Sequence, residues 1–242
     1  MSQQMPLFAP ESKWSPPQNL PDLSSAKEIA VDLETCDPGL ILKGPGWATN
    51  TGEVVGVAVA TEGWSGYLPF KHQGGGNLEK DFVVNWLKKQ MATSSDKIFH
   101  NAMYDVGWLK RLGVEVTGTI QDTMIAAPLV NENRNRYSLD SLGSEYCGER
   151  KDESLLREAA HSFGVDPKAE MWKLPANYVG PYAEQDAVLT LKLWQVLKEL
   201  MEKEEVNQIY SLERDLLPLL IEMRWRGVRV DENAADEKSH YL

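Results

Sequence analysis

Glu28-Ile-Ala-Val-Asp-Leu-Glu34 is a short, mostly apolar run that also carries acidic side chains. Its aliphatic residues favour a buried β-strand. Residues two apart in a strand point to the same face, so Asp32 and Glu34 project together from its end. A solvated pair at a strand end is the alternative for so short a motif. Carboxylates among apolar neighbours are costly unless they are compensated, so the run predicts a buried strand with functional acids.

Further strands and helices are predicted along the chain from this run. Strands are predicted at 54–60, 66–70, 97–100 and 116–120. Helices are predicted at 78–91, 102–112, 122–130, 138–146, 154–162, 182–203 and 209–226. A long Gly- and Pro-rich loop is expected at 36–52. Three strands followed by alternating helices and strands predict an α/β fold with a five-stranded mixed sheet flanked by helices.

Composition limits the class of protein. The chain has 242 residues, of which 42% are hydrophobic and 25% charged, as in globular domains rather than disordered or fibrous chains. Proline-rich residues 1–26 predict an irregular leader, 27–205 the α/β domain and 206–242 a helical segment leading toward a further domain. Neither an apolar stretch of ~20 residues nor a signal peptide is present, so a soluble intracellular protein is expected. Two cysteines exclude a disulfide framework and a four-cysteine zinc site.

The net charge of −11 disfavours loose binding of phosphate polymers through a general positive field. A protein of this charge that reads nucleic acid needs a local basic patch or divalent cations. Cations held by clustered carboxylates reverse the sign of the local potential. The charge therefore makes the arrangement of the acids decisive.

Two more acidic positions follow the first pair. Asp105 belongs to His100-Asn-Ala-Met-Tyr-Asp105, at the start of a predicted helix, where capping by Asn101 and the helix dipole give an alternative reason for these residues. Tyr182 and Asp186 are four residues apart and share one helical face. An exposed aspartate beside a packed tyrosine is the alternative there. All four acids can converge at the carboxyl edge of one sheet, where two divalent ions would form a clamp for phosphodiester hydrolysis.

The residues resemble a known family at this point. Asp32-Leu-Glu-Thr, Asn101-x-x-Tyr-Asp105 and Tyr182-x-x-x-Asp186 are similar to the three motifs of the DEDD superfamily of 3′→5′ exonucleases, which have a ribonuclease H-like fold. The segments Asp122-Thr-Met-Ile-Ala-Ala and Tyr137-Ser-Leu-Asp-Ser-Leu resemble the proofreading domain of family A DNA polymerases, particularly phage ones. The resemblance covers about residues 28–230. It implies that residues 206–242 lead toward an absent polymerase domain.

The resemblance implies a mechanism with two Mg²⁺ ions, for which Mn²⁺ would substitute. Asp32, Glu34 and Asp186 would ligate one ion, while Asp32 would also hold the second, with support from Asp105. Tyr182 would orient the attacking water. The expected products are nucleoside 5′-monophosphates from the 3′ end of single-stranded or frayed DNA. The expected setting is the cytoplasm of a bacterium or a phage-infected host, without membrane contact, and the expected partner is a polymerase domain in a longer natural chain.

The third motif decides the subclass, since the superfamily has either a tyrosine or a histidine there. His161-x-x-x-x-Asp166 and His100-x-x-x-x-Asp105 both fit the histidine spacing. Gly164 and the Asp166-Pro167 pair break any helix that would join the first of these, and His100 belongs to the second motif. The tyrosine subclass is therefore favoured, with both histidines as structural or surface residues.

Substrate contacts are expected from stacking of frayed bases and from basic side chains near the site. The aromatic candidates have packing as their alternative role, and the arginines have ordinary solvated loop charge. The long loop after the first motif departs from the cellular proofreading pattern. The predicted substrate-binding residues are Leu33, Thr35, Asn101, Tyr104, Trp47, Trp172, Arg134 and Arg136.

Two other functions compete with proofreading. An RNA-trimming exonuclease of the ribonuclease D type would share the tyrosine motif, although the polymerase-like tail opposes it. A catalytically silent module that holds a frayed primer is a rival from another class. All five motif residues are present, which weakens the second rival.

Overall fold

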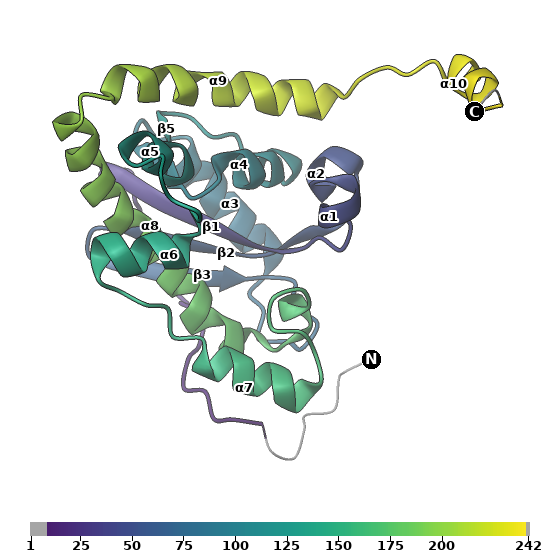
Figure 1. The fold of residues 1–242 in the computed structure, drawn as a ribbon. Coiled ribbons are helices and arrows are strands. Elements are labelled where there is room, and N and C mark those ends of the chain that lie inside the picture. Colours follow the sequence, from purple (N-terminus) through teal and green to yellow (C-terminus); the bar gives the residue numbers. More distant parts are fainter. Residues whose placement is uncertain (1–8, 241–242) are drawn as a thin grey trace.

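A mixed five-stranded sheet forms the centre of the protein (Figure 1). The computed structural model describes residues 9–240, so the first eight residues of the predicted leader lie outside the described residues. The sheet order is β3-β2-β1-β4-β5; the β1–β2 and β2–β3 pairs are antiparallel, and the β1–β4 and β4–β5 pairs are parallel. This confirms the predicted α/β fold and places the first acidic strand at the centre. The strands are β1 (Glu28–Cys36), β2 (Glu53–Thr61), β3 (Trp64–Pro69), β4 (Asp96–Phe99) and β5 (Ile120–Asp122).

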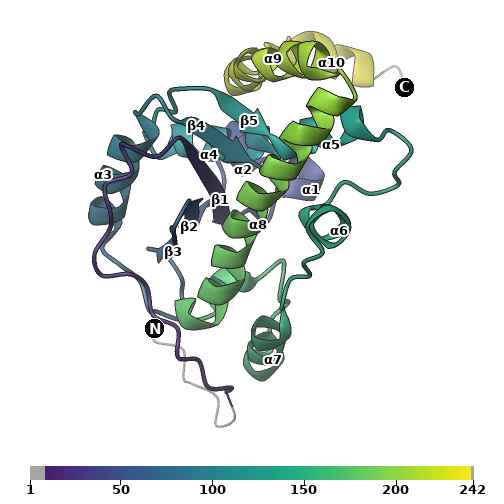
Figure 2. The same ribbon diagram turned by 90° about the vertical axis from the view of Figure 1, so that its left-hand side faces the viewer.

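Helices cover both faces of the sheet (Figure 2). Two of them, α3 and α4, pack on one face, while α8 crosses the opposite face with α5, α6 and α7 beside it. The helices are α1 (Leu40–Lys43), α2 (Gly46–Thr49), α3 (Lys80–Met91), α4 (Ala102–Arg111), α5 (Thr123–Val130), α6 (Leu139–Leu142), α7 (Ser154–Phe163), α8 (Ala176–Lys203), α9 (Asn207–Arg226) and α10 (Glu232–Ser239). A π-helical turn, η1 (Gly143–Cys147), and a 3₁₀ turn, η2 (Met171–Lys173), complete the set.

The alternation of side chains along β1 explains why α8 lies so close to the acids. Ile29, Val31 and Leu33 point into the core beneath α3 and α4. Ala30 faces α8, and Ala58 and Ala60 lie opposite β1 on the same face. Small side chains allow a helix to approach a sheet closely, so the face of β1 that carries its carboxylates is also the face on which α8 packs.

The fifth strand begins later than predicted. We expected it at 116–120, whereas β5 spans Ile120–Asp122. Gly118 adopts a left-handed conformation with φ 78°. The Thr117 N–H donates to the Met91 carbonyl outside the sheet. Residues 116–119 therefore turn toward the end of α3, and pairing with β4 starts after that turn.

Helix α8 also begins earlier than predicted. We expected the helix to start at Tyr182, after Pro181, whereas α8 starts at Ala176 and contains the proline. Proline has no N–H, so the Asn177 carbonyl loses its helical partner. The Ser12 hydroxyl donates to this carbonyl at 2.6 Å. A hydrogen bond from outside the helix thus lets α8 continue through the proline.

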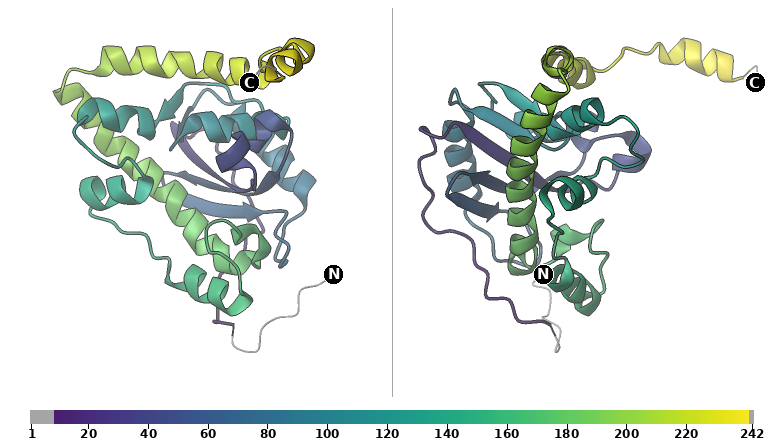
Figure 3. Two further views of the ribbon diagram at one scale, coloured as in Figure 1. Left: turned by 45° about the vertical axis from the view of Figure 1, so that its right-hand side comes forward. Right: turned by 60° about the vertical axis from the view of Figure 1, so that its left-hand side comes forward.

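Helix α9 packs on the domain through only part of its apolar surface (Figure 3). Tyr210, Leu217 and Ile221 are buried toward the domain. Helix α10 has no buried residue. Within residues 9–240, no helix is both long and apolar enough to cross a membrane. The apolar side chains of α9 that stay exposed are Ile209, Leu212, Leu216, Leu219, Leu220, Met223 and Trp225.

Candidate active site

The first two acids lie at the end of the central strand. Asp32 and Glu34 are both half-buried on the α8 face of β1. Glu34 pairs in register with Gly56, and the β1–β2 register shifts directly after it. A bulge of this kind re-aims the following side chains and is common near active sites. The strand thus presents two carboxylates from a rigid central position.

Asp105 reaches the same strand from α4. Its side chain is buried, with 4% exposure, and its Oδ1 accepts a hydrogen bond of 3.2 Å from the Leu33 N–H. Asn101 adopts a left-handed conformation and makes no side-chain cap, which overturns the capping alternative for this residue. Asp122 binds the Asn101 and Ala102 N–H groups instead, at 3.0 and 2.7 Å. The exposed Asn101 side chain is therefore not used by the helix.

The third motif, Tyr182 and Asp186, lies on α8, which packs on the face of the sheet that carries Asp32 and Glu34. Tyr182 and Asp186 are both buried, and Asp186 faces the ammonium group of Lys151 at 2.7 Å from Nζ to Oδ1. Lys168 donates to the Tyr182 hydroxyl at 3.0 Å. Lys151 Nζ lies 3.5 Å from the same hydroxyl. Both lysines come from the segment between η1 and η2, which folds over the acids.

The pKa of each of the four carboxylates is raised. Burial is the first cause in every case. Repulsion by Asp186 helps to raise the pKa of Asp32 to about 7, and repulsion by Asp32 adds to the raised pKa of Glu34 and of Asp105. Lys151 opposes the rise in the pKa of Asp186. Three elements far apart in sequence thus converge on one acidic cluster.

The donor set suits divalent cations. Carboxylate oxygens are the ligands preferred by Mg²⁺ and Mn²⁺. Asp186 Oδ1 is buried and has no hydrogen-bond partner, so its contact with Lys151 is an ion pair without hydrogen-bond alignment. Within the described part of the chain, no three Asp, Glu, His or Cys side chains stand close enough to hold one metal ion together. The chemistry of the cluster therefore fits, and binding a cation requires side chains of the cluster to move.

Two of the predicted base-stacking residues are core residues. Trp47 is 2% exposed, stacks on Trp225 at 6.2 Å between ring centroids, and fills the space beside Gly107. Leu33 is also buried in the core beneath α4. A base cannot stack on either side chain without unpacking the domain, so both expectations are incompatible with the structure. Trp172 is half-buried in η2, which packs next to β1, and stays a candidate.

The remaining candidates divide between the rim of the site and a separate loop. The Thr35 hydroxyl lies 2.7 Å from the Tyr104 hydroxyl, which also donates to Asp37 at 3.1 Å. This chain ties the end of β1 to α4. Arg134 forms an ion pair with Glu145 of η1 and donates to Ser141 of α6, so its charge is already paired within the protein. Arg136 is exposed in that loop.

Sequence reasoning missed Lys151 and Lys168. Each lies more than ten residues before the motif that it contacts, and no spacing rule connects a loop lysine with a helix across such a separation. The two histidine alternatives also have clear positions. His161 is exposed near the end of α7, which stops at the left-handed Gly164 before Asp166. His100 is bonded to the Thr123 hydroxyl at 2.8 Å.

Sheet order, the α8 layer and the acids at the end of β1 define a ribonuclease H-like α/β fold of the kind found in exonucleases. A family profile described as 3′-5′ exonuclease matches residues 18–202. The chain belongs to this family, the 3′-5′ exonuclease domain of family A DNA polymerases. It is 38% identical over 241 residues to a DNA-directed DNA polymerase of Pseudomonas phage M6, covering 96% of this chain and 36% of that protein. The chain thus spans about a third of this relative's length.

Solved structures show the same fold at low sequence identity. Brucella melitensis NrnC superposes with a TM-score of 0.62 at 19% identity, covering 86% of this chain and 91% of NrnC. NrnC is also known with bound Mg²⁺ and bound to pGG. Escherichia coli RNase D, an exoribonuclease, superposes with a TM-score of 0.56 at 15% identity, covering 85% of this chain and 47% of RNase D. These likenesses support the fold and leave the choice of substrate open.

Proposed function

We propose that this domain removes nucleoside 5′-monophosphates from the 3′ ends of DNA by phosphodiester hydrolysis assisted by two Mg²⁺ ions, with Mn²⁺ as a substitute. The observation that carries the proposal is the convergence of Asp32, Glu34, Asp105 and Asp186 from β1, α4 and α8. Divalent cations bound by these carboxylates would lower the pKa of water and neutralise charge on the phosphate. The similarity to a phage DNA polymerase along nearly the whole chain favours DNA as the substrate.

The chain's own residues supply positioning and charge in this reaction. The Tyr182 hydroxyl accepts from Lys168 and is hydrogen-bonded to the Asp186 carboxylate, so these two residues orient it beside the acids. Lys151 and Lys168 place two ammonium groups beside the acids, where they are paired with Asp186 and Glu153 and so offset part of the negative charge that a phosphodiester would meet. The terminal nucleotides would pass four of the predicted substrate-binding residues, namely Asn101, Thr35, Tyr104 and Trp172.

We further propose that the domain proofreads within a longer polymerase, in the cytoplasm of a bacterium or phage-infected host. The matched phage relative is about three times as long as this chain. In a protein of that length, residues 206–242 would connect the exonuclease domain, residues 27–205, with the polymerase portion. Leu212, Leu219 and Met223 on α9 are 56–60% exposed and would pack against it. Hydrogen exchange along α9 should then be slower in such a longer chain than in the isolated domain.

Digestion of matched single-stranded DNA and RNA oligonucleotides in Mg²⁺ tests the choice of substrate. The proposal predicts faster shortening of DNA, and faster shortening of a primer with a mismatched 3′ end than of a matched primer. Preferential digestion of RNA would favour a ribonuclease D-like activity. Binding of DNA without digestion in either metal would favour a silent primer-binding module.

A further inference from the structure

The leader segment around Ser12 and Trp14 lies against the part of α8 that carries the third motif. From there the chain passes the edge strand β3, where Pro17 lies near Gly66, and reaches α3 on the other face of the sheet (Figure 2). At α3, Trp86 Nε1 donates to the Pro21 carbonyl at 2.8 Å. The leader therefore wraps around one edge of the sheet. Ser12 and Trp14 precede the residues 18–202 that match the family profile.

The first contact supplies the hydrogen bond that α8 lacks at Pro181. Pro181 leaves the Asn177 carbonyl without a helical partner, and the Ser12 hydroxyl donates to it at 2.6 Å. An unsatisfied carbonyl at this point would weaken the turn that leads directly into Tyr182. The leader thus supplies a hydrogen bond that α8 cannot make for itself.

In the second contact, the Trp14 indole packs on Gly180 of α8. A Cβ atom on Gly180 would lie 2.2 Å from the indole ring of Trp14, so the ring rests directly on the helix backbone. Glycine inside a helix costs about 1 kcal/mol relative to alanine. A glycine at this position is therefore explained by the space that Trp14 requires.

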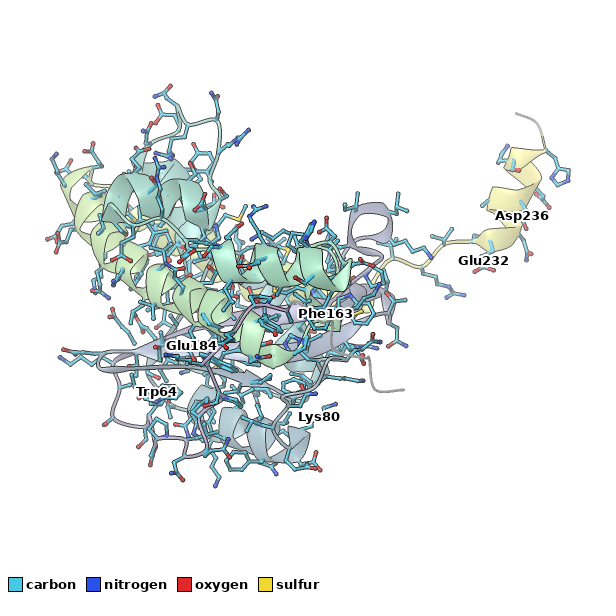
Figure 4. The ribbon with its side chains drawn as sticks, turned by 90° about the horizontal axis from the view of Figure 1, so that it is seen from below. Trp64, Lys80, Phe163, Glu184, Glu232 and Asp236 are labelled. Atoms are coloured by element: carbon cyan, nitrogen blue, oxygen red, sulfur yellow. The ribbon has the colours of Figure 1, made fainter. Side chains whose placement is uncertain are left out.

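The third contact joins α8 to the sheet through Glu184, which lies between Tyr182 and Asp186 in sequence. Glu184 Oε1 accepts from Trp14 Nε1 at 2.9 Å and from the Tyr67 N–H at 3.0 Å. The Tyr67 hydroxyl lies over Gly56, the residue that pairs with Glu34. Figure 4 labels Glu184 on α8 and Trp64, the first residue of β3.

We propose that residues 12–14 are a positioning clamp that fixes the α8 turn from Asn177 to Asp186 against β3, and thereby sets Tyr182 and Asp186 relative to Glu34. This inference rests on the proposed nuclease function for its effect on catalysis. Trp14, Ser12 and Glu184 touch no reacting group, so they act through the placement of α8. The clamp makes the leader part of the working domain and not a passive extension.

Two variants and a matched control test the clamp. Trp14→Ala should speed hydrogen exchange at residues 176–186 about tenfold. In the digestion assay it should lower kcat at least about fivefold while KM stays within about twofold, because the terminal nucleotides still bind. Trp14→Phe should recover part of kcat. Trp64→Ala removes an equally large aromatic from β3, where it packs on Trp86, and should lower Tm without changing kcat or exchange in α8.

Gly180→Ala gives a second test, because an alanine here would fill the space that the Trp14 indole occupies beside α8. Its Cβ should displace the indole and reproduce the effect of Trp14→Ala, and it should add nothing in the Trp14→Ala background, where the ring is gone. Unchanged exchange at residues 176–186 in Trp14→Ala would overturn the clamp, and so would an equal increase in Trp64→Ala. The hydrogen-exchange result tests the clamp whether or not the unaltered protein digests nucleic acid. If the unaltered protein digests none, that result refutes the proposed function and leaves the test of the clamp unaffected.

Discussion

Lys151 Nζ lies 2.7 Å from Asp186 Oδ1, and the side chains of both residues are less than 10% exposed. This buried ion pair joins the loop after η1 to the third-motif helix. Other pairs of the chain, such as Lys192 with Glu149, are largely solvated. The ammonium group compensates one carboxylate of a cluster whose members otherwise repel one another.

Removing this ammonium should destabilise the domain. Lys151→Met leaves a buried carboxylate without its partner, and breaking such pairs costs about 3–5 kcal/mol. We expect a loss near the lower value in urea unfolding at neutral pH with chelator. The loss should become smaller as pH falls, because the raised pKa of Asp186 lets this carboxylate take up a proton more readily than an ordinary aspartate. Lys192→Met is the matched control and should cost less than about 1 kcal/mol; equal losses in both variants would contradict the account.

The acidic cluster should make the domain less stable as pH rises. The pKa of Asp32 is raised to about 7 in the folded state and is about 3.9 in an unfolded chain. Between these values the folded state holds more protons, so the free energy of unfolding falls with increasing pH. We expect a fall of about 1–2 kcal/mol from pH 5 to pH 7 in chelator, with a smaller fall in Asp32→Asn. An identical pH profile for that variant would show that Asp32 does not titrate in this range.

The tyrosine of the third motif should act on turnover. Tyr182→Phe keeps the packing of α8 and removes the hydroxyl held by Lys168. We expect kcat for DNA digestion to fall about 10–100-fold, with KM within about threefold. Tyr178→Phe, one turn earlier, is the matched control, because the Tyr178 ring packs on Phe163 away from the acids. A normal rate in Tyr182→Phe would remove the hydroxyl from the mechanism.

Substitution of the two tryptophan candidates should affect different properties, namely stability for Trp47 and substrate binding for Trp172. Trp47 is buried against Trp225, so Trp47→Ala should lower the free energy of unfolding by about 3–5 kcal/mol. Trp172 is half-buried, and loss of one stacked base costs about 1–3 kcal/mol, so Trp172→Ala should raise KM with little change in stability. Urea unfolding and steady-state digestion distinguish the two effects. An unchanged KM for Trp172→Ala would leave the stacking residue unassigned.

Periodicity and motif spacing predicted most of the fold. The apolar residues of Glu28–Glu34 predicted a buried strand, and the helical spacing of Tyr182 and Asp186 placed both on one face of α8. Local rules failed where a distant group intervened. Pro181 suggested a helix start because the hydroxyl that satisfies Asn177 comes from Ser12, 165 residues away. Val116 was read as strand because the link from Thr117 to Met91 is invisible in sequence.

Part of the candidate site could also be predicted from the sequence. Four carboxylates and a tyrosine stood out because their residue types suit metal-assisted hydrolysis at the spacing found. Lys151 and Lys168 did not, since lysine in a charged loop has no periodic signature and its partner is fixed only by folding. Trp47 failed for a related reason: a Gly- and Pro-rich loop suggested exposure, whereas α1 and α2 fold that loop so that the indole enters the core.

Digestion of DNA oligonucleotides labelled at either end tests the central claim most directly. In Mg²⁺ or Mn²⁺, a 3′ label should appear at once as a mononucleotide, while a 5′ label should pass through a ladder of shorter strands, and chelator should stop both. The double variant Asp32→Ala, Glu34→Ala should remain folded by circular dichroism and digest nothing. Continued digestion by that double variant, or release of the 5′ label first, would contradict the account.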